Sequence, residues 1–170
     1  MQITADVTLK GPVWAEMLDL LVGEYIPTNM DLYALSISIG MMYDGQIESD
    51  TMVPGDYKEN PRYIPRGVLI QNKHKSLLEF MLQAAMITTK HVDFSEQVRL
   101  EIAFNEKNVE KFSPIQFLTK YANYGIVKIK EAIGDATDVE LMQKMTTFLD
   151  SIYETGYDPT VDLELIIDEN

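Results

Sequence analysis

Histidines and carboxylates are the residues of this sequence with the most obvious capacity for chemistry. His74 and His91 are seventeen positions apart and the chain has no cysteine, so neither histidine has the spacing of a zinc ligand. The phosphate-binding pattern G-x-x-x-x-G-K-[ST], the dinucleotide-binding pattern G-x-G-x-x-G and the nucleophile pattern G-x-S-x-G are all missing from the sequence. We therefore predict no catalytic residues, no metal and no cofactor. Scattered carboxylates leave a metal-dependent enzyme as a third hypothesis.

Basic side chains lie beside tyrosines in the stretch from residue 58 to residue 75. Cations can hold phosphates and aromatic rings can stack on bases, so this pattern is compatible with nucleic-acid binding. The candidate contacts are Lys58, Arg62, Tyr63, Arg66, Lys73 and Lys75. The alternative interpretation is a solvated loop whose positive charges neutralise nearby acidic helices.

Charge is distributed unevenly along the 170 residues. The net charge is −13 in total: −8 over residues 1–57, +5 over residues 58–130 and −10 over residues 131–170. This excess of acid repels nucleic acid at long range and disfavours autonomous DNA binding, so we expect DNA contact only through a partner. The N-terminal stretch carries no basic and apolar leader pattern, and no apolar run reaches membrane-spanning length; we expect a cytoplasmic protein with no membrane contact.

The elements that would position these groups are mainly helical. Residues 1–10 alternate as a half-buried strand, and Pro12 opens a helix that ends near Pro27. Thr28 or Asn29 caps the next helix, 30–43, whose body is apolar nearly all round and therefore central. Residues 44–66 are predicted to form one long loop.

The second half of the chain continues the helical pattern. Helices are predicted over 73–90 and 114–133, and another begins at Asp135 or Thr137 with Met142, Leu149 and other apolar residues facing inward. The 95–112 segment is left open between helix and strand. Residues 157–170 form an acidic tail or strand, which either pairs with the N-terminal strand or adds an edge strand to a partner.

From these elements we predict a single domain over residues 1–170. Its fold is a mainly α, compact bundle of five or six helices. We leave open a small β-sheet formed by the terminal segments together with "GVLIQ", residues 67–71. Oligomerisation with further copies also stays open.

A glycine in the middle of the 114–133 helix requires an explanation. Gly125 costs about 1 kcal/mol relative to alanine inside a helix. The simplest reason is the close approach of another helix backbone over Ala122 and Gly125, with Asn123 satisfying a nearby polar group.

Two stretches resemble a known family, the Dnd (DNA phosphorothioation) system-associated protein four family. "YIPTNMDLYALSISIGMMYDGQ" is similar to its proline-led, alanine-containing helix that ends in a glycine turn, and "FLTKYANYGIVKIKEAI" is similar to its Tyr-Ala-Asn-x-Gly helix. "LLEFMLQAAMI" lies where the family has a middle helix, so the resemblance covers about residues 25–133. The motif residues are Tyr121, Ala122, Asn123 and Gly125.

The resemblance implies a role in prokaryotic, anti-phage genome defence beside DNA modification and restriction proteins, with no catalytic role to carry over. We therefore expect a non-enzymatic accessory or adaptor subunit that binds larger proteins of such a complex. Candidate contact surfaces are the 44–66 loop, Trp14 and the acidic C-terminus with Val161, Leu163 and Leu165. Alternatives are a nucleic-acid-contacting module that uses residues 58–75, or an acidic inhibitor protein whose carboxylates imitate a phosphate backbone.

Overall fold

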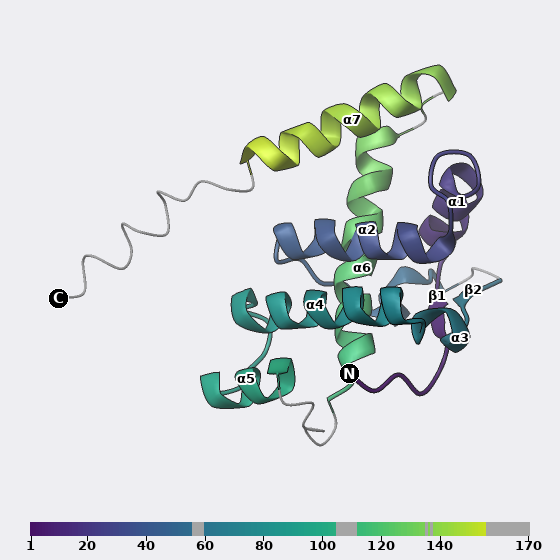
Figure 1. Ribbon diagram of the computed structural model, residues 1–170. Helices are drawn as coiled ribbons and strands as arrows, with labels where there is room; N and C mark the ends of the chain where they lie inside the picture. The colour runs from purple at the N-terminus through teal and green to yellow at the C-terminus, as the bar shows by residue number, and fades with distance from the viewer. Residues whose placement is uncertain (56–59, 105–111, 135, 137, 156–170) are drawn as a thin grey trace. The chain divides into compact units, whose positions relative to one another are not determined.

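The computed structural model describes residues 1–55, 60–104, 112–134, 136 and 138–155 of the chain (Figure 1). The chain divides into two compact units, residues 1–130 and 131–170, and each is described by itself. The described residues form seven α-helices, one short 3-10 helix and two short strands. The prediction of a mainly helical bundle with a small sheet is therefore confirmed.

The elements follow the chain in a simple order. The first unit contains β1 (Val7–Leu9), α1 (Pro12–Leu21), α2 (Asn29–Met42), η1 (Ser49–Met52), β2 (Arg62–Ile64), α3 (Arg66–Leu69), α4 (Asn72–Thr88), α5 (Glu96–Phe104) and most of α6 (Pro114–Ile133). The second unit contains the last turn of α6 and α7 (Asp138–Thr155).

Helix α2 forms the centre of the first unit, as its all-round apolar sequence predicts. Thr28 is the N-cap: its hydroxyl oxygen accepts a hydrogen bond from the Asp31 amide at 3.2 Å. Most of α2 is buried, except for one face whose residues are half-buried or exposed: Asp31, Leu35, Ser38 and Met42. In Figure 1 α2 and α4 lie side by side, and α6 crosses them.

The two strands form an antiparallel pair in which Val7 faces Ile64 and Leu9 faces Arg62. The "GVLIQ" segment is not a strand, since most of it belongs to the short helix α3. Pro65 has no amide hydrogen to continue a ladder, and the Arg66 amide donates instead to the Asp6 carboxylate at 2.7 Å. The predicted C-terminal strand lies outside the described residues.

The 44–66 segment contains more order than a single loop. It includes η1 and β2, and its first part is held against α6 by a hydrogen bond from the Ile47 amide to the Lys120 carbonyl at 3.0 Å. Met52 is buried. Met52 and Ile64 anchor the segment to the core, while its other described residues are half-buried or exposed; residues 56–59 lie outside the described ranges.

The ambiguous 95–112 segment contains a helix over Glu96–Phe104 in its described part. Its helix, α5, is tied to α4 by the Arg99 guanidinium, which donates to the carbonyls of Met86, Ile87 and Thr89 at 2.6, 3.0 and 2.9 Å. These are carbonyls at the C-terminal end of α4, where a cation is electrostatically favourable. Local propensity leaves helix and strand open for this segment. In the structure, the helix is accompanied by these contacts with α4.

The second unit contains a helix with one buried side. Leu141, Met145 and Ile152 of α7 are buried as predicted, but Met142 and Leu149 are exposed, which corrects the inward orientation predicted for them. Across the described parts of the chain, no helix combines the length and apolarity that crossing a membrane requires.

Candidate functional site

The family-like motif of α6 lies at a backbone contact with α2. A Cβ atom built on Gly125 would lie 1.9 Å from the Ser36 carbonyl oxygen, and one built on Gly40 would lie 2.1 Å from the Tyr121 carbonyl oxygen. Ala122 is fully buried. The predicted close approach of a helix over Ala122 and Gly125 is confirmed, and glycines on both helices permit it.

Asn123 joins three separate parts of the first unit. Its Oδ1 accepts a hydrogen bond from the Trp14 indole Nε1 at 2.9 Å, while its Nδ2 donates to the Ile47 carbonyl at 3.0 Å and the Ser49 hydroxyl at 3.2 Å. Trp14 is 0% exposed and Asn123 1%. Trp14 is therefore a core residue that offers no surface to a partner, and Asn123 satisfies nearby polar groups as expected.

Tyr121 is the centre of a second polar cluster, which the sequence did not reveal. Its hydroxyl lies 2.9 Å from Asp44 Oδ1 and 2.5 Å from Thr89 Oγ1. The other Asp44 carboxylate oxygen accepts from the Lys90 amide at 3.1 Å, and His91 Nε2 hydrogen-bonds to the Asp44 carbonyl. Asp44 adopts a left-handed backbone conformation, φ +43°, which these contacts hold in place.

Burial favours the neutral form of two tyrosines of the core by raising their pKa. It raises the pKa of Tyr121 to about 12, and it raises that of Tyr33, whose hydroxyl lies 2.9 Å from the Thr119 hydroxyl, still further. A general base needs a pKa near neutrality. The cluster is therefore suited to positioning the 44–49 segment rather than to proton transfer.

Three of the six candidate nucleic-acid residues have internal partners. Arg62 forms an ion pair with Asp19 at 2.6 Å, Lys75 one with Glu79 at 3.5 Å, and Arg66 Nε donates to the Ile3 carbonyl at 2.9 Å. Tyr63 is 51% exposed and Lys73 is also exposed. Lys58, like Val161, Leu163 and Leu165, lies outside the described residues.

An apolar surface covers the outer side of α4 and α5. Leu77, Phe80 and Ile87 recur along one face of α4, and Leu100 and Phe104 are one turn apart on α5. Phe80 is 67% exposed and Ile87 59%. Ile87 of α4 and Leu100 of α5 line one groove of about 300 Å³ together. We call these five residues the α4–α5 apolar surface.

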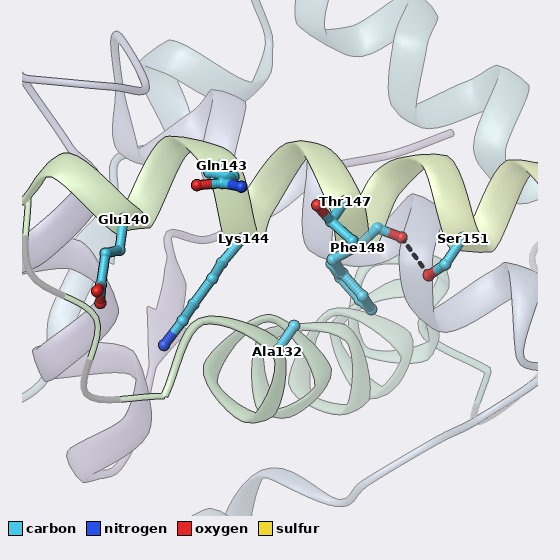
Figure 2. Close-up of a pocket in the computed structure, with 7 residues that line it drawn as sticks. All are labelled: Ala132, Glu140, Gln143, Lys144, Thr147, Phe148 and Ser151. Atoms are coloured by element: carbon cyan, nitrogen blue, oxygen red, sulfur yellow. Dashed lines mark hydrogen bonds between the residues drawn. The ribbon is translucent and has the colours of Figure 1, made fainter.

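The second unit has an open hollow of about 620 Å³ on α7. Figure 2 shows Lys144 and Phe148 extending from α7 toward the end of α6, where Ala132 lies. Lys144 Nζ donates to the Ile133 carbonyl at 3.3 Å, and the Ser151 hydroxyl donates to the Phe148 carbonyl at 2.7 Å. The Lys144 ammonium and the Ser151 hydroxyl therefore both donate to backbone carbonyls of the second unit.

Within the described ranges, no three side chains of His, Asp or Glu converge as metal ligands would.

The fold defines the chain as a mainly helical protein with a small antiparallel sheet. Comparison with protein-family models gives no match, and neither curated proteins nor solved structures give one. The resemblance to the Dnd-associated family therefore stays a prediction.

Proposed function

We propose that the protein is a non-enzymatic adaptor subunit that binds a larger protein through the α4–α5 apolar surface. The observation that carries this proposal is the exposure of five large apolar side chains on adjoining helices, on a protein whose other surface is rich in acid. Removing exposed apolar side chains from water on association is favourable. Such a surface is typical of a protein-binding site.

The class of partner follows from the family resemblance. If the chain belongs beside a DNA phosphorothioation system, the larger partner is a protein of a prokaryotic DNA modification or restriction complex that acts against phage. The charge distribution supports DNA contact through that partner only, because the net charge is −13 and Arg62, Arg66 and Lys75 have internal contacts.

Affinity purification of the tagged protein, co-expressed with the proteins of a DNA phosphorothioation system, tests the proposal. Wild-type protein is expected to retain a partner after nuclease treatment. Phe80→Glu and Ile87→Glu are expected to lose it, because each would bury a charge at the contact. Tyr153→Glu, at an exposed aromatic position on α7, is the matched control.

Two outcomes would count against the adaptor role. Retention of the partner by both glutamate variants would remove the α4–α5 apolar surface from the contact. Loss of every partner on nuclease treatment would instead favour the nucleic-acid-contacting alternative. Circular dichroism and thermal unfolding of each variant separate loss of binding from loss of fold.

A further inference from the structure

The outer edge of β1 has no neighbouring strand in the described part of the first unit. The sheet there consists of β1 and β2, paired antiparallel with Val7 opposite Ile64 and Leu9 opposite Arg62. An edge of this kind presents main-chain N–H and C=O groups to any extended chain that lies beside it.

Pro61 shows which main-chain groups of β1 point to that edge. Residues directly opposite in an antiparallel pair either exchange two hydrogen bonds themselves or are flanked by hydrogen bonds from their neighbours. For Leu9 and Arg62 the flanking arrangement needs an N–H on residue 61, which proline lacks. Leu9 therefore exchanges hydrogen bonds with Arg62. By the alternation of the ladder, Thr8 directs its N–H and C=O away from β2, and the described residues supply neither group with a hydrogen bond.

A cleft of about 490 Å³ runs along this edge. Residues 4–8 and Lys10 line one side, and residues 48–50 and the start of α6 line the other. The fully described strand β2 contributes nothing to the lining, although Tyr63 lies directly opposite Thr8 and shares its face of the sheet. The cleft therefore borders the edge of β1 and not the face of the sheet. We call it the edge cleft.

The side chains of the edge cleft are partly engaged with one another, but its main-chain groups are not. Lys10 pairs with Asp50 at 3.1 Å and Lys120 with Glu48 at 2.5 Å. Neither ion pair uses the N–H or C=O of Thr8, so both can persist when a strand binds there. An extended peptide is the class of ligand that satisfies such groups, since it adds as a further strand to an open sheet edge.

Charge favours a basic peptide over an acidic one. The lining carries the carboxylates of Asp6, Glu48 and Asp50 against the ammonium groups of Lys10 and Lys120. The Asp6 carboxylate accepts a hydrogen bond from the neutral Arg66 amide rather than from a cation. The Glu48 and Asp50 side chains are 65% and 94% exposed, so a further cation can reach them.

The same charges disfavour the acidic C-terminal segment of this chain as the occupant. Residues 157–170 contain aspartates and glutamates and no basic side chain, and residues 1–57 have a net charge of −8. Like charges across a contact are unfavourable, whereas a positively charged segment is attracted.

We propose that the edge cleft binds an extended, positively charged segment of a partner protein, which adds as a strand to the free edge of β1. The main chain of this segment pairs with Thr8, and its lysine or arginine side chains lie near Asp6, Glu48 and Asp50. This inference does not rest on the α4–α5 apolar surface, since it uses different residues.

Fluorescence anisotropy with the full chain tests the proposal. The probe is a labelled octapeptide in which lysine alternates with valine and threonine, and its saturable binding is expected. The same peptide with N-methylated amides keeps its charge but has no N–H to donate, and it is expected to bind about tenfold or more weakly. A counterpart with glutamate in place of lysine and a peptide of residues 157–170 are also expected to bind more weakly.

Thr8→Pro removes the main-chain N–H that faces the edge cleft. Because that N–H is not part of the ladder to β2, the strand pair is expected to persist, and binding of the basic peptide is expected to weaken about tenfold. Thr8→Val is the matched control: it keeps the N–H, loses only the hydroxyl and is expected to bind as the wild type does. Circular dichroism and thermal unfolding check that both variants fold.

Asp6→Asn tests the charge independently. It keeps an oxygen that can accept from the Arg66 amide and removes only the negative charge, so binding is expected to weaken by about threefold to fivefold. Glu24→Gln, at an exposed position outside the lining of the edge cleft, is expected to leave binding unchanged.

Several results would overturn the proposal. These are the absence of saturable binding by the basic peptide, equally tight binding of its N-methylated form, and unchanged binding by a folded Thr8→Pro protein. If Thr8→Pro does not fold, unchanged binding by Asp6→Asn overturns the basic partner. Tighter binding of the 157–170 peptide would also overturn it, by assigning the edge cleft to the chain's own C-terminal segment.

Discussion

The indole N–H of Trp14 donates to the side-chain oxygen of Asn123 at 2.9 Å, joining two residues that are 109 positions apart. Both side chains are buried, and Asn123 also donates to the Ile47 carbonyl and the Ser49 hydroxyl. One carboxamide therefore connects α1, α6 and the segment that leads into η1. Several hydrogen bonds of the core depend on this single residue.

Asn123→Leu tests this dependence. The substitution keeps a similar volume but leaves the Trp14 N–H and the Ile47 carbonyl without their partner. An unsatisfied buried polar group costs about 1–3 kcal/mol, so we expect a loss of this order or larger in the free energy of unfolding, measured by denaturant titration. Asn72→Leu, at an exposed position in the first turn of α4, is the control. Equal effects of the two variants would contradict the role of Asn123.

For Gly125→Ala, helix propensity and packing predict changes in stability of opposite sign. Propensity alone predicts a gain of about 1 kcal/mol. The new Cβ would lie 1.9 Å from the Ser36 carbonyl oxygen, however, so α2 and α6 must separate and we expect a net loss of about 2 kcal/mol.

Gly67→Ala is the matched control for Gly125→Ala, because a Cβ on Gly67 would meet no atom within 4 Å. We expect the control to be neutral or to stabilise by about 0.5 kcal/mol. Thermal unfolding of both variants measures the sign of each change in stability. A stabilised Gly125→Ala protein would show that α2 and α6 are not in backbone contact.

Tyr121 makes stability depend on alkaline pH. Burial raises its pKa from 10.0 to about 12, so the folded state holds the phenolic proton more tightly than the unfolded state does. The resulting stabilisation is complete below pH 10 and is lost as the pH rises toward 12. The free energy of unfolding is therefore expected to fall across this window.

Tyr121→Phe is expected to reduce the slope of that pH dependence, as well as lowering stability at neutral pH through the lost contacts to Asp44 and Thr89. Denaturant unfolding at a series of pH values measures the slope. Tyr153→Phe is the control because Tyr153 is largely exposed. A slope unchanged in Tyr121→Phe would mean that the phenol has no raised pKa in the folded protein.

Arg99→Ala should loosen α5 from α4. The guanidinium supplies three hydrogen bonds to carbonyls at the end of α4, where a cation also interacts favourably with the helix dipole. We expect a loss of about 1–2 kcal/mol and faster amide hydrogen exchange in α5.

The control for Arg99→Ala is Arg62→Ala, which breaks only an exposed ion pair with Asp19. An exposed pair contributes about 0–1 kcal/mol. If hydrogen exchange in α5 were equally fast in both variants, Arg99 would not be the residue that holds α5 in place.

Local signals in the sequence predicted most of the helices. Ser113 and Pro114 correctly marked the start of α6, and Thr28 was one of the two caps proposed for α2. These signals act within one helical turn, because a cap satisfies amides only three or four residues away. The need for a close helix contact at Gly125 was also readable, since the cost of glycine inside a helix is local.

Contacts over long sequence distances were not predictable in the same way. The sequence leaves open a sheet of the terminal segments with "GVLIQ", whereas the observed partner of β1 is Arg62–Ile64. The sequence also makes Trp14 a candidate contact residue, whereas Trp14 is buried. Apolar periodicity predicts that Met142 and Leu149 of α7 face inward. Both are exposed, because exposure depends on which other elements cover the helix.

The helical composition of the protein and the special packing of its Tyr-Ala-Asn-x-Gly helix were already determined by the order of its residues. Tertiary structure alone decided that Ser36 meets Gly125, that Asn123 satisfies Trp14 and that Asp44 meets Tyr121. The physical reason is one of range: backbone hydrogen bonds of a helix form within four residues, whereas each of these contacts depends on the path of the whole chain between its partners.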